Sequence, residues 1–123
     1  MAATFPLLKL NDNSVEVEEY YLDAEKLLEG NPRQSVWNHY TDPTGKYFSG
    51  FWESEVGKWS ISYTEEETCY LLAGISIVTD AEGSATTLRT GDSFVIPKGF
   101  KGSWEVVEPS RKLYAIYEEP QES

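Results

Sequence analysis

The feature that most constrains the fold of this chain is a succession of short β-type segments. From Lys46 onward, runs rich in Tyr, Trp, Phe, Val, Ile and Thr alternate with Gly, Pro, Asp and Asn at intervals of about 8 to 12 residues. This spacing predicts strands at residues 47–53, 58–64, 67–79, 84–89, 93–97, 102–108 and 112–118. The chain is therefore expected to be an all-β protein.

The rest of the chain adds little to this pattern. A further strand is expected at residues 15–21, and residues 120–123 are expected to form a frayed tail. One short helix is predicted at residues 23–30, where Asp23 can cap the first turn and Gly30 ends the last one. Turns are expected at 80–83, 90–92 and 97–99. Many short antiparallel strands favour either a sandwich or a jelly-roll barrel.

Composition excludes several classes of protein. The 123 residues include 10 Lys and Arg against 21 Asp and Glu, which gives a net charge of −11. The length fits a single domain over residues 1–123, and an aromatic content of 14% is typical of a folded chain. Because nucleic acids and anionic membranes attract basic proteins, neither is an expected partner.

The N-terminal residues and the cysteine content favour a cytosolic protein. Cys69 is the only cysteine, so no internal disulfide can form, and residues 1–10 carry no basic and apolar pattern of a secretory signal. No apolar run is long enough to predict a transmembrane helix. A homodimer is expected because a second copy readily covers an exposed sheet edge such as residues 15–21.

Two motifs with a specific residue spacing distinguish the jelly-roll barrel from the sandwich. Gly91 is followed after five residues by Pro97 and after one more by Gly99, and Glu67 is followed after six residues by Gly74. In physical terms the first motif is a tight turn, a short strand and a second turn. Both spacings resemble the two motifs of the cupin (RmlC-like) superfamily, whose fold is a jelly-roll β-barrel.

Within the cupins, the sequence resembles one branch, the small single-domain cupins of the DUF861 or "cupin 3" type. The resemblance covers residues 50–117 and rests on the segments 51–53, 65–67, 70–74, 91–92, 97–99, 102–106 and 111–114 together with Trp59. The pattern is also similar to the ethanolamine-utilisation accessory cupins and, more distantly, to the ureidoglycine aminohydrolases. One fold hosts many chemistries, so function must be argued from the residues.

The resemblance also implies a metal site that this sequence does not complete. Many cupins hold Mn, Fe, Ni or Zn with two His, a Glu and a third His. The corresponding positions here are Ile61, Tyr63, Glu67 and Gly102, of which only the Glu has a ligand side chain. We therefore expect no metal of the usual cupin type. The alternative is an unusual set of metal ligands, in which Tyr63 or Cys69 joins Glu67 and Glu65.

Alternation along the predicted strand suggests which side chains form a site. Glu65 and Glu67 would share a face with Tyr63 and Cys69, whereas Glu66 would point away. Carboxylates buried together become candidate acids or bases, so Glu67, Glu65 and Tyr63 are the predicted catalytic residues.

Aromatic side chains near the motifs are the candidate ligand contacts. Trp59, Tyr63 and Trp104 are predicted to bind a ligand together with Cys69, which could also act as a nucleophile. Trp52 is equally consistent with a core position. His39, the single histidine, lies before the motif region and carries no predicted mechanism.

The basic pair at residues 111 and 112 is interpreted as structural. Only one of Arg111 and Lys112 can face inward, because neighbouring side chains of a strand point to opposite faces. We expect the pair to supply surface partners for the acidic excess.

Three functions remain open from the sequence. The first is binding of a small polar metabolite in the barrel mouth without a metal. The second is an enzyme acting on a small carbonyl, sugar or ureido compound, with Glu67 or Glu65 as general base and Tyr63 as acid. The third is an accessory or scaffold subunit whose barrel is filled by its own Trp and Tyr side chains and whose role is protein contact.

Overall fold

Antiparallel pairing joins almost all of the chain into a single curled sheet. The computed structural model describes residues 6–10 and 15–119. Their elements are β1 (Glu18–Tyr20), η1 (Ala24–Lys26), β2 (Leu27–Glu29), β3 (Gln34–Thr41), β4 (Tyr47–Ser54), β5 (Gly57–Ser62), β6 (Glu66–Asp80), β7 (Ala85–Arg89), β8 (Ser93–Ile96) and β9 (Lys101–Tyr117). The all-β prediction is confirmed.

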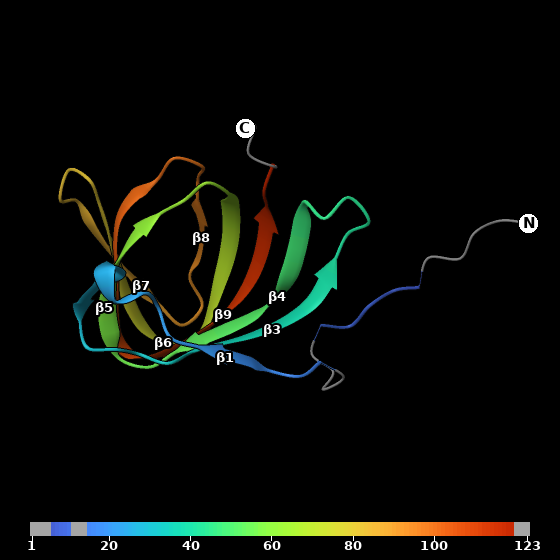
Figure 1. The fold of residues 1–123 in the computed structure, drawn as a ribbon, viewed down its shortest axis with the longest axis horizontal. Helices are drawn as coiled ribbons and strands as arrows, with labels where there is room; N and C mark the ends of the chain where they lie inside the picture. Colours follow the sequence, from blue (N-terminus) through green and yellow to red (C-terminus); the bar gives the residue numbers. More distant parts are fainter. Residues whose placement is uncertain (1–5, 11–14, 120–123) are drawn as a thin grey trace, which may run out of the picture.

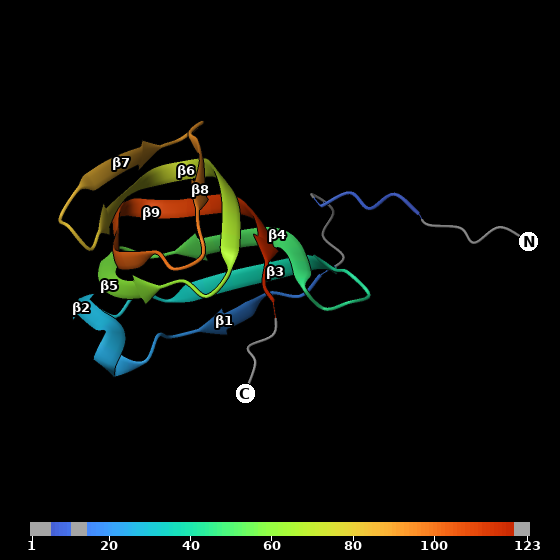
Figure 2. The same cartoon turned by 90° about the horizontal axis from the view of Figure 1, so that it is seen from above.

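The longest strand organises the sheet. The strand order is β1-β3-β4-β9-β5-β2, and β6 pairs with β7, β8 and β9. On one side, the first part of β9 pairs with β5 and the second part with β4, while β6 follows its other side. The sheet curls so that β6 and β7 lie across the interior from β3 and β1 (Figures 1 and 2).

The strand β9 corrects a prediction, because residues 102–108 and 112–118 were expected to be two strands. Pro109 has no N–H to donate, but it lies between the parts of β9 that pair with β5 and with β4, so no ladder bond is lost there. Gly74 of β6 lies against it, and a Cβ at Gly74 would come within 2.2 Å of the Pro109 carbonyl oxygen. The two strands therefore pass this point with a shift in register.

The segment before β3 contains a second correction. The helix predicted at residues 23–30 is only the three-residue η1, and the Asp23 side chain makes no capping hydrogen bond. Leu27 instead pairs with Trp59 of β5, where it packs against the core. Tertiary packing has therefore turned the second half of this segment into β2.

Two further differences concern the first strands. The strand predicted at 15–21 is present as the shorter β1, and β3 was not predicted at all. Its polar residues gave β3 a weak strand pattern, and its pairing with β4 shifts register between Asn38 and Tyr40. Residues 120–123, expected as a tail, lie outside the described residues.

The three predicted turns are confirmed. The N–H of Gly83 donates to Asp80 O, that of Asp92 to Arg89 O, and that of Phe100 to Pro97 O. No helix in residues 6–10 and 15–119 is long and apolar enough to cross a membrane.

Large buried side chains form the core inside the curled sheet. The buried cluster contains three tryptophans and mainly aliphatic neighbours: Trp52, Trp59, Trp104, Leu71, Val78, Leu88, Ile96, Val106 and Tyr114. Four residues of this cluster also line the cavity described below, namely Trp52, Trp59, Trp104 and Tyr114. The tryptophans therefore belong both to the core and to the cavity wall.

Candidate functional site

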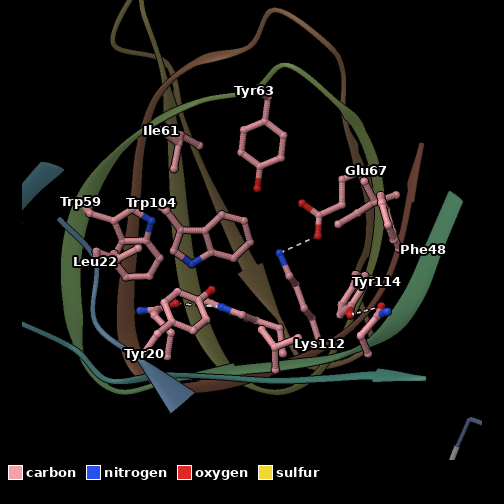
Figure 3. A pocket seen from close by; sticks show the side chains of 15 residues that line it. Tyr20, Leu22, Phe48, Trp59, Ile61, Tyr63, Glu67, Trp104, Lys112 and Tyr114 are labelled. Atoms are coloured by element: carbon pink, nitrogen blue, oxygen red, sulfur yellow. Dashed lines mark hydrogen bonds and ion pairs between the residues drawn. The ribbon is translucent and has the colours of Figure 1, made fainter. Parts of the chain in front are cut away.

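A cavity of about 330 Å³ lies inside the curled sheet, a size typical of small-molecule sites. Aromatic and aliphatic side chains form most of its wall, and its polar residues are two amides, three tyrosines and one ion pair (Figure 3). The lining residues are Tyr20, Leu22, Gln34, Val36, Asn38, Phe48, Trp52, Trp59, Ile61, Tyr63, Glu67, Trp104, Lys112, Tyr114 and Ile116.

The ion pair joins Lys112 of β9 to Glu67 of β6. Lys112 Nζ lies 2.8 Å from Glu67 Oε2, and the two side chains are only 7% and 5% exposed. The two residues lie on neighbouring strands but not opposite each other, because Glu67 pairs with Ile116 and Lys112 with Leu71. The long Lys112 side chain extends through the cavity to reach the carboxylate (Figure 3). Both charges are therefore buried against the cavity rather than solvated.

The side chains of Arg111 and Lys112 point to opposite faces of β9, as alternation along a strand requires. Lys112 points inward, whereas Arg111 points outward and forms a 2.7 Å ion pair with Glu53. The prediction that only one of them faces inward is confirmed. The expectation that both serve as surface partners is wrong for Lys112, because β9 is covered on its inner face by the curled sheet.

Two indole rings flank the ammonium group. Lys112 Nζ lies 4.6 Å from the ring centroid of Trp52 and 4.5 Å from that of Trp104. Trp59 stacks on Trp104 at 6.5 Å with an interplanar angle of 10°. A cation over a ring face is attracted by the ring quadrupole, so the tryptophans help to hold the charge of Lys112 in place.

The surroundings of Lys112 keep its side chain in the charged form. Burial has the largest single effect and acts to lower the pKa of Lys112, but Glu67, Cys69 and Tyr63 together outweigh it, so the pKa is raised above its usual value. Lys112 therefore remains an ammonium group. It can donate hydrogen bonds and stabilise negative charge, but it is not available as a neutral amine nucleophile.

Tyr63 brings a hydroxyl group to the same part of the cavity. Its backbone is fixed because its N–H donates to Phe100 O and its carbonyl accepts from Gly99 N. The ring extends into the cavity, with its hydroxyl directed toward Glu67 and Lys112 (Figure 3). Burial raises the pKa of Tyr63, Lys112 opposes the rise, and the charge and hydrogen bond of Glu67 add to it. Tyr63 therefore stays protonated.

The structure separates Glu65 from Glu67 but not from Trp59 and Tyr63. Glu65 does not line the cavity that contains Glu67 but a second pocket beside it, which it shares with Trp59, Tyr63, Lys26 and Lys101. Burial raises the pKa of the Glu65 carboxyl group. Strict alternation placed it with Glu67, but residues 63–65 lie between the end of β5 and the start of β6. Side chains in such a connection need not alternate.

Cys69 faces inward as predicted but does not line the cavity. It is 1% exposed and pairs with Phe94 of β8 and Tyr114 of β9. Burial raises the pKa of the Cys69 thiol to about 12, with Lys112 lowering it and Glu67 raising it further. The thiol is therefore neutral and shielded, whereas nucleophilic cysteines are exposed and ionised.

The remaining predicted site residues all lie at the cavity. Trp59, Tyr63, Glu67 and Trp104 come together at the cavity, and Trp52 joins them. His39 does not line it, and its ring instead contacts Phe51 edge to face at 5.6 Å.

Sequence comparison gives the family of the chain. The family model of the EutQ-like cupin domain, Cupin_3, matches residues 41–114. The chain belongs to this cupin family. A comparison with curated proteins found no match to this cupin.

Solved structures agree with this assignment and with the predicted jelly-roll fold. A DUF861 family protein of unknown function from Pseudomonas syringae is 22% identical, with a TM-score of 0.76. The match covers 85% of this chain and 46% of that protein, so this cupin spans about half its length. A DUF861 family protein from Thermotoga maritima is 41% identical over 52% of this chain and 73% of its own, with a TM-score of 0.51.

A third similar structure is a putative ethanolamine utilization protein Q from Salmonella typhimurium. It is 17% identical, with a TM-score of 0.63, and the match covers 85% of this cupin and 98% of that protein. At this identity the likeness concerns the fold alone. The predicted family, DUF861 or "cupin 3", and the predicted cupin jelly-roll barrel are both confirmed.

The residues at the cupin metal positions do not fit a metal of the usual type. A Cβ at Gly102 would come within 1.8 Å of Thr79 O, so the backbone leaves no room there for a ligand side chain. Ile61 has no donor atom, and the Glu67 carboxylate is held by Lys112. Within the described part of the chain, no group of three or more His, Cys, Asp or Glu side chains could hold a metal ion.

Sequence reasoning missed several groups that shape the cavity. The Tyr114 hydroxyl donates to Asn38 Oδ1 at 2.8 Å, and the Trp52 indole N–H donates to Gln34 Oε1 at 2.8 Å. Asn38 and Gln34 lie on β3, the strand that was not predicted. Lys112 could have been found, because alternation places it on the same face as Tyr114.

Proposed function

We propose that this cupin binds a small polar metabolite in the cavity without a metal ion. The observation that carries the proposal is the Lys112–Glu67 pair, buried among aromatic side chains at the cavity wall. Burying two charges costs free energy that an apolar pair of similar size would not cost. Charges retained at such a place are therefore best explained by contact with a ligand.

The arrangement suggests how such a ligand would lie. The indole faces of Trp59 and Trp104 offer flat apolar surface, while the Tyr63 hydroxyl and the Lys112 ammonium offer polar contacts. Pockets of this kind fix orientation with a few polar groups and gain affinity from burial of apolar area. The expected ligand has a polar end near Lys112 and an apolar or ring part against the indoles.

A second candidate function is catalysis on a small carbonyl, sugar or ureido compound. It is favoured by the convergence of Tyr63, Glu67 and Lys112 on one part of the cavity (Figure 3). Tyr63 would act as proton donor, Glu67 as general base, and Lys112 would stabilise negative charge on a carbonyl oxygen. For such an enzyme, Glu67→Gln should lower the rate by about 100- to 10,000-fold. An unchanged rate would exclude Glu67 as the base.

The scaffold hypothesis is less favoured, because it requires a barrel filled by its own side chains and the cavity measures about 330 Å³. The expected homodimer and the cytosolic location stay predictions.

Fluorescence can test the binding proposal in a selective way. Of the four tryptophans, Trp52, Trp59 and Trp104 line the cavity, whereas Trp37 lies under the Arg111 guanidinium. In a Trp37→Phe background every remaining indole therefore reports on the cavity. We would screen small polar metabolites by ligand-observed NMR and follow each hit by fluorescence titration.

Two variants that each introduce a phenylalanine ring separate the cavity from the surface. Ile61→Phe fills part of the cavity, while Val95→Phe adds a ring at a site that is 61% exposed on β8. We expect Ile61→Phe to weaken binding by at least about tenfold and Val95→Phe to leave it unchanged. Equal binding to both variants, or no saturable hit for the folded protein, would contradict the proposal.

A further inference from the structure

We infer that the ligand of this cavity carries no formal charge. The inference rests on the proposed function and names the class of molecule that the same site selects. It follows from the charge balance of the wall. Of the fifteen lining residues only Glu67 and Lys112 are charged, and they neutralise each other at 2.8 Å.

The other polar side chains of the cavity wall offer no charge that could pair with a charged ligand. Gln34 accepts from Trp52 and donates to Ser54 Oγ, and Asn38 accepts from Tyr114, so both amides are already engaged. Tyr63 and Tyr114 are neutral hydroxyl groups, and burial raises the pKa of both. A charged ligand would find only the paired ammonium and carboxylate.

A charged ligand would interact unfavourably with that pair. A charged ligand that broke the pair would leave one buried charge without its partner, and a charged ligand that left the pair intact would lie close to a buried charge of its own sign. The two indoles at 4.5 and 4.6 Å also favour Lys112 in its present position. The net charge of −11 adds a long-range repulsion against anions.

An uncharged ligand avoids this cost and can still use the polar groups. A carbonyl or hydroxyl oxygen can accept a hydrogen bond from Lys112 while the ion pair stays intact, because an ammonium group has three donors. An apolar ring can lie on the faces of Trp59 and Trp104. The favoured class is therefore an uncharged molecule with a carbonyl or hydroxyl group and a small apolar or ring part.

Three probes of nearly equal shape test the charge of the ligand. Benzamide is neutral, benzoate is an anion and benzamidine is a cation at pH 7. Each is titrated into the Trp37→Phe protein and followed by fluorescence and ligand-observed NMR. We expect benzamide to bind more tightly than either charged probe by at least about tenfold.

Variants of the ion pair should change this order in opposite directions. Glu67→Gln leaves Lys112 as the unpaired charge and should strengthen benzoate binding by at least about tenfold, while Lys112→Met should do the same for benzamidine. Glu66→Gln and Arg111→Met change neighbouring charges outside the cavity and should leave the order as in wild type.

A neutral double variant keeps the test decisive if a single variant does not fold. Glu67→Gln combined with Lys112→Met removes both charges and should again prefer benzamide. A wild-type protein, or a double variant, that prefers benzoate or benzamidine would overturn the inference while leaving the binding proposal intact. Absence of saturable binding for all three probes in wild type and variants would overturn the proposal of a ligand cavity, and the inference with it.

Discussion

The free energy of unfolding of Lys112→Met measures how strongly the buried ion pair depends on both partners. The change removes the ammonium group but keeps a flexible apolar chain between Trp52 and Trp104. The Glu67 carboxylate, at 5% exposed, then loses the cation that lies 2.8 Å away. Removing one partner of a buried pair costs about 3 to 5 kcal/mol, and we expect a loss of stability in this range at pH 7.

The double variant separates the cost of an unpaired charge from the value of the pair itself. Replacing both residues, as Glu67→Gln with Lys112→Met, leaves no buried charge. Because a buried pair gains little over an uncharged pair of similar size, the double variant should lie within about 1 kcal/mol of wild type or be more stable. Its stability should therefore exceed that of either single variant, a strong coupling between neighbouring residues.

Urea unfolding, followed by tryptophan fluorescence and circular dichroism, measures these differences directly. Arg111→Met serves as the matched control, since the Arg111–Glu53 pair is 35% and 43% exposed and should contribute no more than about 1 kcal/mol. The reasoning is refuted if Lys112→Met costs less than about 1 kcal/mol, or if the double variant loses as much as the two single variants together.

Three further predictions follow from groups around the site and the sheet. Burial raises the pKa of the folded Cys69 thiol to about 12, so the thiol of the unfolded chain ionises at a lower pH. The free energy of unfolding should therefore fall as the pH rises from about 9, and it should fall less steeply in Cys69→Ala. Urea titrations that give parallel curves for the two proteins would refute this. The same burial should make native Cys69 react with a thiol reagent at pH 8 at least about 100-fold more slowly than the urea-unfolded chain, and equal rates would show an accessible thiol. Gly74→Ala should lower the free energy of unfolding by about 1 to 3 kcal/mol, since Gly74 has a φ of 89° and a Cβ would meet Pro109 O. Gly83→Ala should lower it less, because Gly83 has a similar φ of 88° but no atom lies within 4 Å of the added Cβ. The reverse order would contradict the steric argument.

The sequence by itself determined the class of fold. Apolar runs between Gly, Pro and Asp turns predicted most of the strands from residue 47 onward, because strand length and turn chemistry are local properties. The spacings around Gly91 and Glu67 led to the cupin family that the comparison confirms. Local alternation also separated Lys112 from Arg111, one to each face of β9.

Local patterns failed where tertiary contacts overrule them. Leu27 follows a short helical turn but belongs to a strand, because Trp59 offers it a pairing partner and a place in the core. Pro109 marks a break in sequence but lies within one continuous strand, because its neighbours on β9 pair with two different strands. Glu65 does not line the cavity with Glu67, because it belongs to the connection between β5 and β6, where the alternation of a strand does not apply.

The candidate site itself was decided only by the tertiary structure. Alternation states which face of a strand a side chain occupies, but not which residue of another strand lies beside it. The register of β4 and β9 pairs Trp52 with Lys112, whereas Glu67 pairs with Ile116, four residues further along β9. The Lys112 side chain reaches Glu67 only by extending through the interior of the curled sheet, where Trp52 and Trp104 contact its ammonium group. Register and curl depend on the pairing of the whole sheet. The charge balance of the cavity is therefore a property of the folded barrel and not of any segment of the sequence.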